Sequence, residues 1–195
     1  MSSVQTTSSL ESPAVVIAEC DRDFYEVVDG VKQELPRMGA YENVLASVLT
    51  KWLIIFADDH GLGWVTTETL FVLDAAKRLQ RRPDVAFVSV ERGRASPVRR
   101  TNAWDVVPDL AVEIVSTTNF ADEIDAKLVD YFAAGVGQVW VIYPETRRLY
   151  VHESLQTARG YSEDDLVDAA PVLPGLTFRL ADLFDAIENI DEPAE

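Results

Sequence analysis

Residues 108–116, PDLAVEIVS, predict a buried strand that carries a carboxylate in its middle. Without Glu113, residues 110–115 would be an unbroken apolar run, which is the pattern of a strand covered on both faces. Alternation along a strand places Glu113 on the same face as Asp109 and Ala111, opposite its aliphatic neighbours. Because an unpaired buried charge is very costly, Glu113 needs a partner, which can be a cation, a proton or a metal ion.

The length and composition indicate one globular domain. The chain has 195 residues, 48% of them apolar, which is enough to bury a core. The Ser/Thr-rich start lacks the features of a secretory signal, so we expect residues 1–20 to be a disordered leader, residues 21–188 the domain and residues 189–195 an acidic tail. No apolar run reaches the roughly 18 residues of a membrane span. The single cysteine, Cys20, excludes an internal disulfide and fits a cytoplasmic location.

The charge distribution leaves two interpretations open. A net charge of -16 argues against nucleic acid as a default partner. Residues 77–100, however, hold eight of the 17 Lys and Arg and only two acids. This segment is either a solvated loop or a local lip that contacts phosphate. With only His60 and His152, the sequence gives little support to a zinc cluster or a Ser-His-Asp hydrolase.

The hydrophobic periodicity predicts an α/β fold with a mixed central sheet. Residues 24–35 form a hairpin that turns at Asp29-Gly30. Helical spacing covers residues 41–57 and 121–134, and Gly135 is a C-cap signal. Residues 91–105 are expected to be a basic loop. Further strands are expected at residues 64–73, 85–90, 138–143, 147–152 and 176–179. A short helix is expected at residues 181–190.

Asp84 is a second carboxylate at a strand, because Pro83-Asp84 leads into the apolar run 85–90. If that strand neighbours the strand of Glu113, the two carboxylates converge, and two carboxylates with waters and a phosphate oxygen are the usual surroundings of Mg²⁺. The alternative is that Asp84 is an ordinary turn residue. Asp109 shares the face of Glu113 but lies roughly 13 Å away, so we expect it to be a helper rather than a co-ligand.

Lys127 leans toward the core side of the helix predicted at residues 121–134. One interpretation is an exposed pair with Glu123 or Asp130, which contributes a few tenths of a kcal/mol. The other is that its ammonium faces Glu113, balances the carboxylates and polarises a water or a phosphate. A buried Glu113 needs a cation and an inward Lys127 needs an anion, so a pair between them accounts for both residues.

An ordered set of segments resembles a known family. It comprises Arg82–Val88, Pro108–Ser116, Lys127 with Tyr131, Gly135-Val136 and Val139–Pro144, together with Tyr25–Gly30 and Pro174–Leu176. The set is similar to the restriction-endonuclease-like family catalogued as domain of unknown function 820, within the PD-(D/E)-x-K nuclease superfamily. The similarity covers roughly residues 22 to 186.

This resemblance implies a restriction-endonuclease-like fold, an α/β fold whose mixed central sheet is flanked by helices. It implies Asp84 and Glu113 as metal ligands for Mg²⁺ or Mn²⁺, and Glu42 as the acid on the first helix. The superfamily lysine normally stands two residues after the glutamate, where this chain has Val115. Lys127 on the following helix would take its place, so that Asp84, Glu113, Lys127 and Glu42 form the catalytic set.

Two functional hypotheses follow. The first is a cytoplasmic Mg²⁺-dependent endonuclease that hydrolyses phosphodiester bonds of DNA or RNA. The second is a catalytically inactive nuclease-fold protein with a binding or regulatory role, in which Glu113 and Lys127 are a buried ion pair. A homodimer through the hairpin at residues 24–35 or the one at 147–152 is compatible with both. The sequence does not distinguish DNA from RNA.

Overall fold

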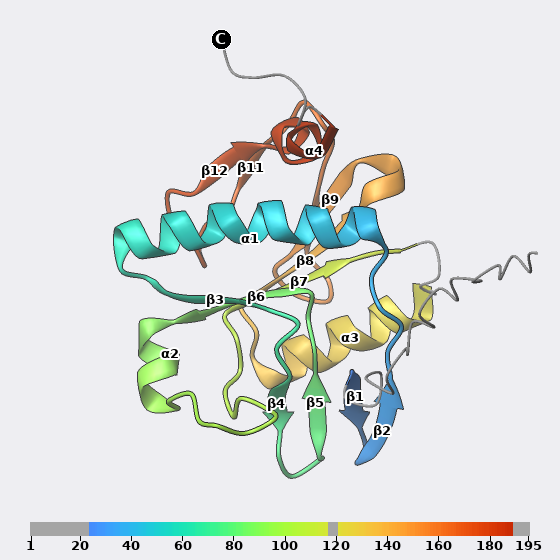
Figure 1. Ribbon diagram of the computed structural model, residues 1–195, viewed down its shortest axis with the longest axis vertical. Helices are drawn as coiled ribbons and strands as arrows, with labels where there is room; N and C mark the ends of the chain where they lie inside the picture. Colours follow the sequence, from blue (N-terminus) through green and yellow to red (C-terminus); the bar gives the residue numbers. More distant parts are fainter. Residues whose placement is uncertain (1–23, 117–120, 189–195) are drawn as a thin grey trace, which may run out of the picture.

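The computed structural model describes residues 24–116 and 121–188, and a six-stranded sheet lies at its centre (Figure 1). The strand order is β10-β9-β8-β7-β6-β3. Strands β7 and β8 are parallel and all other neighbours are antiparallel, which confirms the predicted mixed sheet. The strands are β3 (Gly63–Thr67), β6 (Val85–Ser89), β7 (Leu110–Ile114), β8 (Gln138–Tyr143), β9 (Arg148–His152) and β10 (Ala158–Tyr161). The predicted leader and acidic tail lie outside the described residues.

Helices cover both faces of this sheet (Figure 1). Helix α1 (Ala40–His60) crosses one face, and α4 (Leu180–Glu188) packs beside it. Helix α3 (Ala121–Ala134) lies on the other face, and the short helix α2 (Val90–Ala95) follows β6. The fold is therefore an α/β arrangement with a mixed central sheet flanked by helices, as predicted.

Helix α1 forms because it places a leucine on its inner face at every fourth position. Leu45, Leu49 and Leu53 are fully buried in the core between α1 and the sheet. The helix ends at Gly61, whose φ of 61° is in the left-handed region that glycine favours as a C-cap. By length and composition alone α1 could also cross a membrane, a criterion that core helices of soluble proteins also meet.

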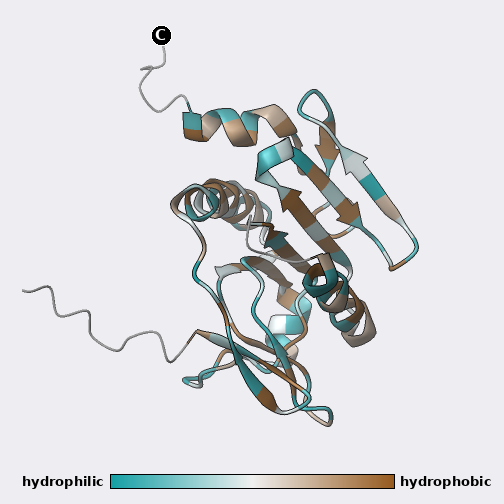
Figure 2. Ribbon diagram, turned by 90° about the vertical axis from the view of Figure 1, so that its right-hand side faces the viewer, coloured by the Kyte–Doolittle hydropathy of each residue, from teal (hydrophilic) through white to brown (hydrophobic). Residues whose placement is uncertain are grey.

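Strand β7 has the alternation that its sequence predicts. Its aliphatic residues Leu110, Val112 and Ile114 belong to the core cluster under α1. Ala111 belongs to the cluster on the opposite face, where α3 packs, and Glu113 points to that face as well. The central strands are the most continuously hydrophobic part of the fold (Figure 2).

A second, four-stranded antiparallel sheet has the order β2-β1-β5-β4. Its strands are β1 (Tyr25–Val28), β2 (Val31–Glu34), β4 (Phe71–Asp74) and β5 (Leu79–Arg81). The β1–β2 hairpin turns at Asp29 and Gly30, which both have positive φ, as an Asp-Gly turn of this kind requires. This sheet brings β1 beside β5, and an ion pair between Glu26 on β1 and Arg81 on β5 joins the two strands.

The sequence prediction missed several short elements. Residues 91–105 were expected to be a loop, but α2 opens this segment, with the Ser89 hydroxyl accepting a hydrogen bond from the Arg92 N–H. Strands β5, β10 and the pair β11 (Leu166–Asp168) and β12 (Thr177–Arg179) are only three or four residues long. Of these only β12 was predicted, because elements this short carry too few residues to show a period.

A candidate active site of two carboxylates and a lysine

Asp84 is held beside Glu113 by the pairing of β6 with β7. The antiparallel register sets Val85 opposite Val112, so Asp84 precedes β6 at the level of Glu113 and Ile114. The backbone N–H of Ile114 donates a hydrogen bond to Asp84 Oδ2 at 2.6 Å, and the Asp84 N–H donates to the Val112 carbonyl at 3.0 Å. The side chain of Asp84 is thus oriented by the strand that carries Glu113.

Glu113 is 3% exposed, and both of its carboxylate oxygens accept hydrogen bonds from α3. Lys127 Nζ donates to Oε2 at 2.6 Å, and the Tyr131 hydroxyl donates to Oε1 at 2.6 Å. Lys127 and Tyr131 stand four residues apart, which places them on the same face of the helix. Of the two interpretations of Lys127, the structure shows the one in which it faces Glu113.

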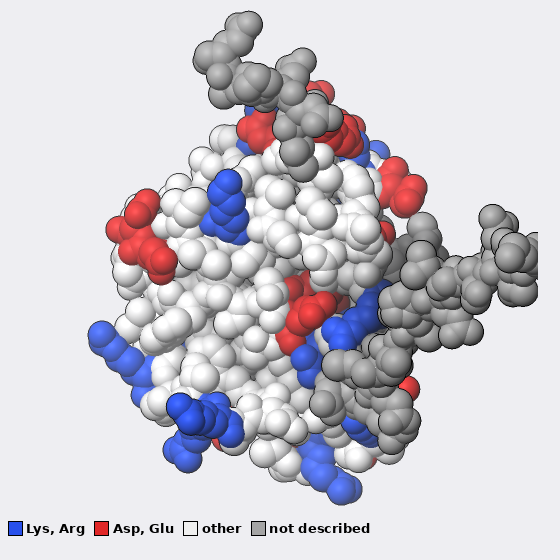
Figure 3. All heavy atoms as spheres, in the orientation of Figure 1, with Lys and Arg blue, Asp and Glu red and all other residues white. Residues whose placement is uncertain are grey.

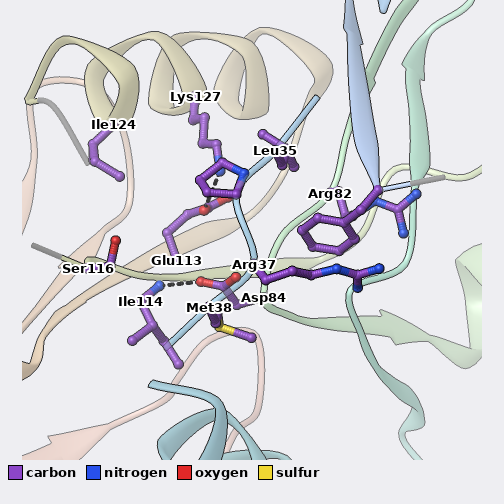
Figure 4. A pocket seen from close by; sticks show the side chains of 12 residues that line it. Leu35, Arg37, Met38, Arg82, Asp84, Glu113, Ile114, Ser116, Ile124 and Lys127 are labelled. Atoms are coloured by element: carbon purple, nitrogen blue, oxygen red, sulfur yellow. Dashed lines mark hydrogen bonds and ion pairs between the residues drawn. The ribbon is translucent and has the colours of Figure 1, made fainter. Parts of the chain in front are cut away.

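Asp84, Glu113 and Lys127 line a small pocket of about 50 Å³ (Figure 4). The segment between β2 and α1 covers one side of it. Asp84 and Glu113 come from the sheet and Lys127 comes from α3. Its lining comprises Phe24, Leu35, Pro36, Arg37, Met38, Arg82, Asp84, Glu113, Ile114, Ser116, Ile124 and Lys127.

The electrostatics of the pocket follow from burial and from charges of the same sign. Burial, and then the nearby Glu113 carboxylate, raise the pKa of Asp84 to about 7. Burial also raises the pKa of Glu113, although Lys127 and Tyr131 oppose this shift. Burial would lower the pKa of Lys127, but the carboxylates of Glu113 and Glu26 outweigh it and raise that pKa, so the ammonium stays charged. In the pocket, the charged Lys127 therefore lies beside two acids, Asp84 and Glu113.

Glu26 is a third carboxylate beside Lys127, and the local sequence pattern does not mark it as a site residue. It is 1% exposed on β1, and its Oε1 lies 3.8 Å from Lys127 Nζ. Arg81 Nη1 donates to Glu26 Oε2 at 2.6 Å, and the Arg82 N–H donates to Oε1 at 2.9 Å. Arg81 also donates to Asp130, at 2.8 and 2.5 Å. In the sequence Glu26 alternates with apolar residues, which is also the pattern of an exposed acid on a hairpin, so the pattern does not indicate that Glu26 is buried.

Two other acids from the sequence analysis lie elsewhere. Glu42 packs its carboxylate against Gly39 at the N-terminus of α1, and it is not among the residues that line the pocket. Asp109 accepts a hydrogen bond from the Ser89 N–H at 2.7 Å and forms an ion pair with Arg92 at 3.0 Å. Asp109 therefore supports the start of α2 and does not line the pocket, and Glu42 is not brought together with Asp84, Glu113 and Lys127.

The basic segment at residues 77–100 divides into residues with different roles. Arg81 is buried in ion pairs, and Arg92 donates to carbonyl oxygens of the β7 entry and of Gly135. Arg94 is exposed on α2, and Arg99 and Arg100 are exposed in the loop after it, where Arg99 lines a separate hollow with Val72 and Ala75. Residues 91–105 do not line the pocket, so this part of the segment is not a lip of the candidate site.

The donor set fits a hard divalent cation. Asp84 and Glu113 are two carboxylates in one pocket, and Mg²⁺ is typically bound by one or two carboxylates together with waters and substrate phosphate. Within residues 24–116 and 121–188 no group of three or more His, Cys, Asp and Glu could hold a metal ion. A cation here would accordingly depend on water and substrate oxygens for its remaining ligands.

Comparisons with known proteins give a family and a fold. A family model described as "Uma2: Putative restriction endonuclease" matches residues 16–181. The crystal structure of a putative nuclease belonging to DUF820, from Anabaena variabilis ATCC 29413, matches with a TM-score of 0.72 and 17% sequence identity. That match covers 83% of this chain and 89% of the other. At this identity the match shows a shared fold. No curated protein matches the chain.

Proposed function

Because the chain belongs to the Uma2 family of putative restriction endonucleases, we propose that it hydrolyses phosphodiester bonds of nucleic acid with a divalent metal ion. The observation that carries the proposal is the convergence of Asp84, Glu113 and Lys127 on one pocket (Figure 4). Asp84 immediately precedes β6, Glu113 lies on β7 and Lys127 lies on α3, so only the fold brings them together. Acids beside a lysine in a cleft are the components that metal-assisted phosphoryl hydrolysis requires.

Asp84 and Glu113 would hold the metal ion, which we take to be Mg²⁺ or Mn²⁺. When bound, such an ion supplies Lewis acidity toward a phosphoryl oxygen and lowers the pKa of water. Each carboxylate has one fixed orientation, because Asp84 accepts from the Ile114 N–H and Glu113 accepts from both Lys127 and Tyr131. A carboxylate has about four lone-pair sites, so these hydrogen bonds leave acceptor positions on both acids.

Lys127 would stabilise negative charge on the phosphate during hydrolysis. An ammonium has three N–H donors, and Glu113 accepts one of them at 2.6 Å. In the reaction a water oxygen forms a bond to phosphorus, the bond to one ester oxygen breaks, and that oxygen gains a proton. A fixed positive charge in a water-poor pocket favours the more highly charged transition state without reorganisation.

The surrounding ion pairs would keep Lys127 in place. Glu26 lies 3.8 Å from the ammonium and is itself held by Arg81, which is held in turn by Asp130 on α3. This chain of contacts links β1, β5 and α3 behind the pocket. Catalytic groups must be held close to their productive geometry, and buried ion pairs behind them serve that purpose.

Cleavage of short oligonucleotides tests the proposal. The substrates are single-stranded and double-stranded DNA and RNA. Purified protein with Mg²⁺ or Mn²⁺ is expected to cut at least one of them, and EDTA is expected to stop the reaction. Asp84→Asn and Glu113→Gln should abolish cleavage, whereas Glu42→Gln, a matched loss of charge outside the pocket, should retain it. A folded protein that cuts none of these substrates under any metal condition contradicts the proposal.

The second candidate is a binding or regulatory protein with a nuclease fold and no catalysis. The use of Lys127 in a buried ion pair with Glu113 favours it. A thermal-shift titration distinguishes the two candidates, because a ligand that binds only the folded state raises its apparent stability. No shift with millimolar Mg²⁺ or Mn²⁺, with or without oligonucleotide, would favour the second candidate.

A further inference from the structure

Three arginines without acidic partners lie on α2 and on the loop that follows it, outside the candidate site. Arg94 stands in the last turn of α2, and Arg99 and Arg100 stand in the loop; all three residues are exposed. None of them forms an ion pair or a side-chain hydrogen bond with any residue in 24–116 or 121–188. Together they make up a basic surface whose charges no described carboxylate neutralises.

This basic surface differs from the rest of the chain, which has 33 acidic residues and a net charge of -16. Arg81, Arg92 and Arg147, in contrast, each lie within 3.0 Å of a carboxylate oxygen. No acid occurs between Glu91 and Asp105. Figure 3 shows Lys and Arg at the lower left of the molecule, over α2 and the loop after it, and Asp and Glu at the top beside α4. A polyanion is therefore attracted to this part of an otherwise acidic molecule.

The loop also presents an apolar side chain next to its charges. Val98 is 66% exposed, more than any other large apolar residue that the structure describes. It stands between Pro97 and Arg99. Arginine beside an exposed apolar side chain is the combination with which many proteins enter a groove of duplex nucleic acid. The loop therefore fits a partner that offers both phosphates and an apolar groove surface.

The two ends of the loop are fixed to the fold, which gives the loop a defined shape. The buried Trp104 donates its indole N–H to the Ser96 carbonyl at 2.7 Å. Its ring stacks on that of Phe71, with the ring centroids 5.9 Å apart. The Ser96 hydroxyl donates to the Asp105 carbonyl. A loop that is ordered before it binds loses less conformational freedom on binding, so these contacts favour a binding role.

The basic surface is separate from the pocket of Asp84. Asp84 immediately precedes β6 and α2 follows that strand, so the pocket and α2 lie beyond opposite ends of β6. Arg99 and Thr101 border a hollow of about 600 Å³ that shares no lining residue with the pocket. A substrate that contacts both places has to be long. A polynucleotide meets this condition and a mononucleotide does not.

We propose that Arg94, Arg99 and Arg100 contact phosphates of double-stranded nucleic acid, and that Val98 enters its groove. The inference rests on the proposed function for the identity of the polyanion. It adds to that function a substrate form, the duplex, and a contact surface separate from the catalytic pocket. A duplex fits better than a single strand because only a duplex has a groove that the tip of the loop can enter.

Binding measured without metal tests this surface separately from catalysis. The probe is a fluorescein-labelled DNA duplex of about 20 base pairs, followed by fluorescence anisotropy in EDTA over a series of salt concentrations. Arg99→Ala combined with Arg100→Ala should weaken binding at low salt roughly tenfold or more, because two phosphate contacts are lost. The slope of log affinity against log salt should fall by about 0.9 for each of these contacts.

The matched control removes two charges elsewhere on the surface. Lys51 on α1 and Arg148 on β9 are exposed, and neither forms an ion pair with a residue in the described ranges. Lys51→Ala combined with Arg148→Ala should change neither the affinity nor the salt slope appreciably. The proposal is overturned if the two double variants behave alike, or if the wild type binds no duplex at the lowest salt.

A variant of Val98 separates the groove contact from the charge. Val98→Ser should weaken duplex binding roughly threefold through the loss of apolar contact. It should leave the salt slope unchanged, because an apolar contact releases no counterions. Exposed side chains without partners contribute little to stability, so all of these variants should keep the urea midpoint of the wild type. An unchanged midpoint shows that a loss of binding is not a loss of folding.

The form of the ligand is tested with one strand of the same sequence. Its binding should not depend on Val98, and an equal effect of Val98→Ser on the strand and the duplex overturns the duplex assignment. Self-association through the basic surface is the other outcome to measure, by sedimentation velocity. If Arg99→Ala with Arg100→Ala abolishes self-association and leaves duplex binding unchanged, the surface serves a protein contact and the proposal is overturned.

Failure of the proposed function gives a different result from failure of this inference. Duplex binding in EDTA that depends on Arg99 and Arg100, without any cleavage in Mg²⁺, contradicts only catalysis. Cleavage in Mg²⁺ together with duplex binding that is unchanged by the loss of both arginines contradicts only the role of the basic surface.

Discussion

The ammonium of Lys127 and the carboxylate of Glu113 lie 2.6 Å apart inside the fold, where α3 packs on β7. The side chain of Lys127 is 13% exposed and that of Glu113 is 5% exposed, so water screens neither charge well. Each group therefore depends on the other for its charged state. This pair couples the stability of the sheet–helix contact to the chemistry of the pocket.

Lys127→Met should destabilise the protein by about 3 kcal/mol, because breaking a buried ion pair leaves an uncompensated charge. Lys127→Met combined with Glu113→Leu should recover most of that loss, since no unpaired carboxylate then remains on β7. The measurement is the free energy of unfolding from urea denaturation. Lys51→Met, at an exposed position of α1, is the control and should change it little. Equal urea midpoints for Lys127→Met and the wild type would contradict the buried pair.

The raised pKa of Asp84 should make the fold less stable as the pH increases. Burial and Glu113 raise this pKa from 3.8 to about 7, so the folded state binds the proton more tightly than the unfolded chain does. The cost of ionising Asp84 is absent below about pH 4, grows up to about pH 7 and is constant above it. Asp84→Asn should therefore raise the free energy of unfolding at pH 8 by on the order of 1–3 kcal/mol. The same substitution should change it little at pH 4, and denaturant titrations at the two values check this difference.

Metal affinity should rise with pH over the same range, because Asp84 must lose its proton to become a ligand. Below pH 7 the apparent affinity for Mn²⁺ should increase up to about tenfold per pH unit, and it should level off above pH 8. Isothermal titration calorimetry at pH 6, 7 and 8 measures this. Glu42→Gln should behave as the wild type does, whereas Asp84→Asn should bind weakly and without the pH dependence. A flat affinity profile for the wild type would exclude Asp84 as a titrating ligand.

The residues of the site that could be predicted are those whose local pattern is anomalous. Glu113 interrupts an apolar run and Lys127 interrupts the inner side of a helix, so both are visible within a single element. Asp84 is visible only as a strand entry, and its position beside Glu113 depends on β6 pairing with β7. That neighbourhood is not visible in the sequence, because the order of strands in a sheet is not encoded locally.

The residues that could not be predicted depend on contacts far apart in the chain. Glu26 and Arg81 are 55 positions apart, and each looks like an ordinary surface charge in its own segment. Arg92 and Arg99 share one basic segment, yet Arg92 is fixed on carbonyls of the β7 entry and Arg99 is exposed. Composition cannot separate these two roles. The direction of the Glu42 side chain, back over Gly39, is a choice of rotamer that a helical pattern does not contain.

Glu26→Gln should show whether the ion pairs behind the pocket contribute to activity. A glutamine keeps the shape of Glu26, but its amide N–H₂ has to face a donor, either Arg81 Nη1 or the Arg82 N–H. We expect a loss of about 2 kcal/mol in the free energy of unfolding, the value for a hydrogen bond to a charged group. Glu34→Gln, an exposed acid on the same hairpin, should cost little.

In catalysis, Glu26→Gln should lower kcat and should leave the affinity for metal nearly unchanged. Glu26 lies 3.8 Å from Lys127 but does not line the pocket of Asp84, so it acts by positioning the lysine and not by holding the metal. With one neighbouring charge removed, the ammonium has more freedom, and kcat should fall at least fivefold while the affinity for Mn²⁺ stays within about twofold. A variant with the expected loss of stability but an unchanged kcat would show that Glu26 supports the fold alone.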